Sequence, residues 1–151
     1  MLVSDNTLLM AMESLVFVRT LCNHEEMGNA LAVGVGGFFG SIARYLVGVI
    51  ISRFFDEPTF PFATFVVNII GCLLIGLLGT LGENTELISP PMQLLLIVGF
   101  LGGFTTYSVF GYQTLRLMRD GHSLFALLNV AAHIVFGLGA VWLGEFLAKQ
   151  F

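Results

Sequence analysis

The sequence predicts an all-α integral membrane protein with four transmembrane helices. Hydrophobic residues make up 56% of its 151 residues and charged residues only 11%, well below the roughly 25% typical of soluble domains. Three stretches, 58–82, 87–115 and 121–144, contain no charged residue, and each exceeds the roughly 20 residues that cross a bilayer. A fourth stretch, Met27 to Ser52, carries only Arg44 and is also long enough to span.

Turns that contain charged residues or proline separate the predicted spans, because prolines and charged clusters disfavour a continuous apolar helix. The spans are predicted over 28–51, 61–82, 92–117 and 123–147. The functional domain is therefore expected to cover 28–151.

Residues 1–27 are predicted to be an N-terminal extension outside that domain. Leu8, Leu9 and Met12 fall on one helical face, so the segment is either a short amphipathic helix or an artefact of a start codon assigned upstream of Met27. The acidic residues Asp5 and Glu13 do not fit a secretory signal peptide, whose first region is positively charged.

The distribution of positive charge predicts that the chain inserts into the membrane in both orientations. Four spans place Arg19 and Lys149 on one side, and Arg53, Arg116 and Arg119 on the other. Lys and Arg near the span ends set orientation, and two against three is almost no bias. Dual topology permits an antiparallel homodimer. Because there is no basic patch, a nucleic-acid partner is not expected.

The second span carries a stripe of small and polar residues along one helix face, which includes Thr64, Asn68 and Gly71. Such a stripe is typical of a helix-packing seam. The amide of Asn68 must find partners inside the hydrocarbon and can donate two N–H groups. Its partner is either another helix or a passing anion.

The third span predicts a break in the helix near the bilayer midplane. Its centre holds a cluster of small and β-branched residues that weakens a continuous helix: Gly99, Gly102, Gly103, Thr105 and Thr106. Carbonyl oxygens at a break suit a cation such as Na⁺, and N–H groups suit an anion. Tight glycine packing is the alternative. Beyond the cluster, Tyr107 and Phe110 share a face.

In the fourth span Asn129 and His133 are four residues apart and lie on one face. Interhelical hydrogen bonding or an ion path would explain them. No Asp or Glu lies deep in any span, and this removes the usual carboxylate of a proton-coupled transporter. The chain lacks nucleophile, zinc-protease and phosphate-loop motifs. We therefore do not expect an enzyme.

Three segments together resemble the Fluc family of fluoride channels, also called CrcB. They are Gly36–Tyr45 (GGFFGSIARY), Pro61–Gly71 (PFATFVVNIIG) and Gly99–Phe110 (GFLGGFTTYSVF). The third segment is the most specific, and the order and spacing of all three match. The resemblance covers about 28–148.

The resemblance implies a multi-pass cell-membrane protein that exports fluoride to relieve its toxicity, with lipid around an antiparallel homodimer that has two pores and one central structural Na⁺. It implies that Asn68 is the pore amide and that Tyr107 and Phe110 are the aromatic pair facing the ion. Gly102 and Thr105 would bind Na⁺ through backbone carbonyls. Other implied pore candidates are Thr64, Ser108, Thr114 and His133, while Arg44 would lie at a vestibule or anchor the helix end.

Three positions depart from the family pattern. Tyr107 stands where Phe is common, Ala63 where Gly is usual, and His133 where a small polar residue is usual. Two other functions compete with a channel: a small dual-topology transporter, which needs a coupling carboxylate, and a membrane scaffold, which needs no inward-facing polar residues.

Overall fold

Four helices of the chain are long and apolar enough to cross a membrane: His24–Phe54, Phe62–Glu83, Pro90–Arg119 and Ser123–Ala148. These bounds confirm the four predicted spans to within a few residues. The computed structural model describes residues 10, 12–13, 24–55, 59–84 and 87–150, so most of the predicted N-terminal amphipathic segment lies outside them. The chain divides into two compact units at Leu31, and the account below concerns the second, Ala32–Phe151.

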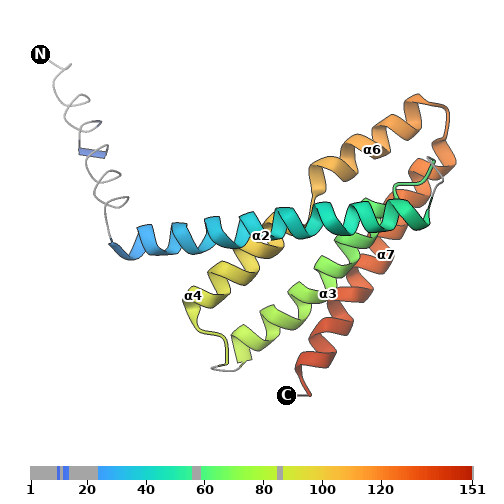
Figure 1. Cartoon of the computed structure of the whole chain (residues 1–151). Coiled ribbons are helices and arrows are strands. Elements are labelled where there is room, and N and C mark those ends of the chain that lie inside the picture. The colour runs from blue at the N-terminus through green and yellow to red at the C-terminus, as the bar shows by residue number, and fades with distance from the viewer. Residues whose placement is uncertain (1–9, 11, 14–23, 56–58, 85–86, 151) are drawn as a thin grey trace, which may run out of the picture. The chain divides into compact units, whose positions relative to one another are not determined.

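Three of the four spans are single helices, whereas the third span along the chain is assembled from several pieces (Figure 1). Helix α2 covers His24–Phe54, and its residues from Ala32 onward belong to this unit. Helix α3 covers Phe62–Asn84 and helix α7 covers Ser123–Ala148. The third span consists of α4 (Pro90–Gln93), the π-helix η1 (Leu94–Leu101), α5 (Gly102–Phe104) and α6 (Tyr107–Arg119).

Helices α3 and α7 run side by side (Figure 1) and approach closely through glycines. A Cβ atom added at Gly76 would collide with the carbonyl of Val141, and one added at Gly144 would collide with the carbonyl of Leu73. Small residues allow helix backbones to touch in a membrane, where no hydrophobic effect drives helices together. The close approach of α3 and α7 therefore depends on these two glycines.

A second glycine seam joins α2 to the first half of the third span. An added Cβ at Gly36 would lie 3.0 Å from the Cα of Gly99, and one at Gly103 would lie 2.5 Å from the carbonyl oxygen of Gly37. A Cβ at Gly40 would collide with the carbonyl of Phe100. The glycines of segments 36–45 and 99–110 thus pack backbone against backbone.

The third span is broken, as predicted, but the break follows the glycines and does not include them. Gly99, Gly102 and Gly103 are helical, whereas Thr105 (φ −83°, ψ 164°) and Thr106 (φ −153°, ψ 112°) are extended. Gly99 and Gly103 pack against α2 in the seam, which holds them helical, whereas nothing lies within 4 Å of the Cβ position of Gly102. The β-branched threonines, which fit extended backbone well, form the interruption.

Replacement of Gly40 with Ala should lower the unfolding free energy in detergent by about 1–3 kcal/mol, the usual cost of overpacking. Gly34 on the same helix has nothing within 4 Å of its Cβ position, so Gly34→Ala is the matched control. It should be neutral or slightly stabilising, since Ala favours a helix over Gly by about 0.5–1 kcal/mol. Equal losses in both variants would show that the seam is not tight.

Candidate functional site

A groove of about 500 Å³ lies beside the break in the third span. Residues of α3, of the third span and of α7 line it: Asn68, Gly71, Cys72, Ile75, Leu101, Thr105, Thr106, Tyr107, Phe110, Val130, His133 and Ile134. Five of the predicted site residues therefore meet there, namely Asn68, Thr105, Tyr107, Phe110 and His133. None of the lining residues carries a formal charge when the histidine is neutral.

The amide of Asn68 closes the break by bonding both backbone groups of one residue. The N–H of Thr106 donates to Oδ1 of Asn68 at 2.9 Å, and Nδ2 of Asn68 donates to the carbonyl oxygen of Thr106 at 3.2 Å. An extended residue inside a membrane span leaves both groups without helical partners, which is costly in hydrocarbon. Asn68 on α3 thus replaces the missing helical bonds.

The hydrogen bonds of His133 fix the tautomer of its neutral ring. Nδ1 lies 2.9 Å from the backbone carbonyl oxygen of Asn129, and a carbonyl can only accept, so Nδ1 carries the hydrogen. Nε2 then has a free lone pair, and it lies 3.3 Å from Nδ2 of Asn68. The second N–H of Asn68 therefore donates to His133.

Aromatic rings form the other wall of the groove. The rings of Phe110 and His133 have centroids 4.4 Å apart at 47°, and those of Tyr107 and Phe110 are 5.9 Å apart at 44°. Tyr107 is 86% exposed in the chain. The predicted pair thus shares one face of α6, with Phe110 against the histidine and Tyr107 at the open edge.

A buried hydrogen-bond chain holds α6 against α7 behind Phe110. Thr114 Oγ1 donates to the carbonyl oxygen of Phe110 at 2.8 Å and accepts from Asn129 Nδ2 at 2.8 Å. Thr114 is 8% exposed and Asn129 is fully buried. Their hydrogen bonds position the groove wall, since neither side chain lines the groove itself.

The remaining predicted residues lie outside the groove lining. Thr64 is buried one turn before Asn68 on α3, whereas Ser108 is exposed at the start of α6. Gly102 is exposed, with nothing within 4 Å of its Cβ position. Arg44 is half-buried on α2. Their suggested roles in the pore, at Na⁺ or at a vestibule stay predictions.

The family model described as "CrcB-like protein, Camphor Resistance (CrcB)" matches residues 31–145. The chain belongs to the CrcB family. This match spans all four helices and includes every residue of the groove.

Curated relatives agree with this membership over nearly their whole length. A Chlorobaculum tepidum protein is 50% identical over 123 residues, 82% of this chain and 96% of its own length. A Methylobacillus flagellatus protein is 44% identical over 82% of this chain and 97% of its own. A Flavobacterium psychrophilum protein is 40% identical over 78% and 94%. Each is named "Fluoride-specific ion channel FluC".

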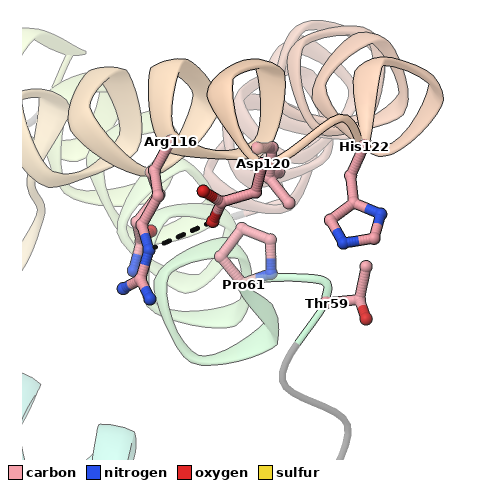
Figure 2. A pocket seen from close by; sticks show the side chains of 7 residues that line it. Thr59, Pro61, Arg116, Asp120 and His122 are labelled. Atoms are coloured by element: carbon pink, nitrogen blue, oxygen red, sulfur yellow. Dashed lines mark ion pairs between the residues drawn. The ribbon is translucent and has the colours of Figure 1, made fainter.

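A second hollow of this CrcB-family chain, of about 410 Å³, lies where α6 ends. Figure 2 shows its exposed ion pair between Arg116 and Asp120, 3.5 Å apart, and the ring of His122 near Thr59. Exposed ion pairs contribute little to stability, and salt screens their charges. Because Asp120 offsets the charge of Arg116, this hollow is a weaker candidate for an anion-binding site than the groove.

Sequence reasoning about this CrcB-family chain missed two features of the groove. Thr106 was part of the predicted break but was not assigned to the site, although its backbone is the partner of Asn68. Cys72 lines the groove and lies four residues from Asn68, on the same helix face. That spacing was the available signal, but an apolar run around the thiol favoured simple packing.

Proposed function

We propose that this chain is a subunit of a fluoride channel that lets F⁻ leave the cell across its membrane. The observation that carries the proposal is an uncharged groove in which an amide, an imidazole and an aromatic wall meet beside a broken helix. The names of the curated relatives supply the ion. The channel has no catalytic step and is not an enzyme.

The groove suits a small anion for electrostatic reasons. Helix α6 begins at Tyr107, beside the groove, and a helix N-terminus carries a partial positive charge of about half a unit. The one N–H of Asn68 that does not bond Thr106 can replace some of the water that surrounds fluoride. Among the described residues that line the groove there is no carboxylate, so no negative charge there repels an anion and no coupling acid of the kind that transporters use is present.

A second copy of the chain is the natural cover for the break. Gly102, Tyr107 and Ser108 are exposed on the single subunit, although they lie near the centre of a 30-residue span. Irregular backbone at membrane depth is tolerated only inside protein or beside water. Near-equal positive charge at the two ends of the spans supports an antiparallel arrangement.

The residues at the break also fit a structural Na⁺ at that dimer centre. The carbonyls at the end of α5 have no following helical turn to bond them, and Gly102 leaves its surroundings open. The hydroxyl of Thr105 bonds back to the carbonyl of Leu101 at 2.9 Å, so Thr105 would offer its backbone oxygen. Two subunits would supply about four oxygens, too few for Ca²⁺. The ion would hold the breaks together and add positive potential.

Replacement of Phe110 with Ile should lower fluoride efflux from proteoliposomes at least about tenfold, the effect of about 1.4 kcal/mol on a barrier, while the dimer remains intact. Asn68→Asp should nearly abolish efflux. Part of that loss would come from the helix break, because the substitution also removes the hydrogen-bond donor to the Thr106 carbonyl. Phe146→Ile is the control, because Phe146 is exposed near the end of α7 and packs on Trp142. Undiminished efflux in Phe110→Ile and Asn68→Asp together would refute the pore assignment.

Dual topology predicts that one position is reachable from both sides of the membrane. With Cys22 and Cys72 replaced, a cysteine at Glu83, exposed near the end of α3, should react with an impermeant thiol reagent in about equal amounts from each side. A cysteine at Ser123, at the opposite end of the spans, should behave alike. Labelling of the two sites from opposite single sides would establish one fixed orientation.

Removal of Na⁺ from both sides of reconstituted vesicles should abolish fluoride flux if the ion is a required structural element. Thr105→Ser should keep the flux, because the hydroxyl bond and the backbone carbonyl both remain, and only the methyl packed against Gly71 is lost. Gly102→Leu should disturb the dimer. Full flux after verified Na⁺ removal would rule out a required ion.

A further inference from the structure

We propose that His133 is a second anion ligand in the groove and becomes one by taking up a proton, so that fluoride flux increases as pH falls. The inference rests on the proposed channel function and concerns the regulation of the same site. It starts from the hydrogen bonds of the neutral groove.

When His133 is neutral, the polar atoms of Asn68 and His133 are used in hydrogen bonds to each other and to the backbone. Oδ1 of Asn68 accepts from Thr106 N–H, and its two N–H groups donate to Thr106 and to Nε2 of His133. The Nδ1–H of His133 donates to Asn129. All four polar atoms of the pair are thus engaged within the described part of the chain, and neither side chain has an N–H free for an anion.

A proton on Nε2 reverses this arrangement. The imidazolium has two donors and no acceptor, so Nε2–H and the Asn68 N–H then face each other across 3.3 Å and can no longer bond. A small anion placed beside both can accept from each. Nδ1–H keeps its bond to Asn129, which holds the ring in place. Hydrogen fluoride is a stronger acid than imidazolium, so the proton stays on the ring and fluoride passes as the ion.

The surroundings of His133 leave the anion as its natural counter-charge. Helix α3 contributes Phe65, with ring centroids 5.3 Å from His133, and Cys72; α6 contributes Tyr107 and Phe110; α7 contributes Asn129. Among the described residues that line the groove there is no lysine, arginine or carboxylate.

Proton and fluoride therefore favour each other's binding at this site. The Phe110 ring, 4.4 Å from the imidazole, also favours a cation. Linkage between two ligands is reciprocal. If the proton strengthens fluoride binding, fluoride must shift the titration of His133 to higher pH, and the free energy of that shift equals the free energy that the proton adds to fluoride binding.

The test measures fluoride efflux from potassium-fluoride-loaded proteoliposomes after valinomycin is added, from about pH 8 down to about pH 5, the range in which histidine titrates. Valinomycin-independent efflux reports electroneutral leak of hydrogen fluoride and is subtracted. At pH values above the midpoint of the titration, wild-type flux should increase up to about tenfold for each pH unit by which the pH falls, as expected for uptake of one proton. His133→Gln and His133→Ser should have flat profiles. His122→Gln, which removes an imidazole outside the groove, should keep the rise.

A second readout follows the proton itself. In ¹⁵N-histidine-labelled protein, the resonance missing from His133→Gln should titrate at higher pH in fluoride than in chloride. Four outcomes would each overturn this inference while leaving the channel function intact. They are a pH-independent wild-type flux, a wild-type flux that falls with falling pH, an unchanged pH slope in both His133 variants, and a His133 titration midpoint that fluoride does not move. Absence of valinomycin-triggered efflux at every pH would overturn the proposed channel function, and this inference with it.

Discussion

The double hydrogen bond between Asn68 and Thr106 is the interaction on which the groove depends. A break inside a span exposes an N–H and a C=O that hydrocarbon cannot satisfy, and each unsatisfied group costs several kcal/mol. One primary amide has the right donor and acceptor for both. With the bond in place, α6 can begin at Tyr107, which puts its N-terminus and the ring of Phe110 beside α3 and α7.

The spans could be predicted from the sequence because burial in a bilayer imposes a requirement on composition alone. Stretches such as 58–82 and 121–144 have no charge, and a helix is the only way for an isolated segment to satisfy its backbone in lipid. The exact break was harder to predict. Glycine weakens helices in water, but in this chain Gly99 and Gly103 are the contact points with α2, so packing holds them helical and the interruption falls on Thr105 and Thr106.

The candidate site could be predicted as a set of residues but not as a network. Spacing puts Asn68, Phe110 and His133 on inward faces, and the structure places all three in one groove. Spacing cannot say which atom of an amide faces which neighbour. That depends on the extended Thr106 and on the carbonyl of Asn129, which fix the Asn68 amide and the His133 tautomer. These are tertiary contacts between positions up to 65 residues apart.

The structural duty of Asn68 limits what it can do for an ion. One of its N–H groups must stay on Thr106 to close the break, so at most one remains for an anion, and in the neutral groove His133 accepts it. A small polar residue with a hydroxyl in place of His133 could both donate and accept, and would not tie the amide so firmly. An imidazole instead has one accepting nitrogen and one committed donor, so its protonation state decides whether Asn68 has an N–H to give. An imidazole at position 133 therefore changes the chemistry of the Asn68 amide beside it, and not only the shape of the groove.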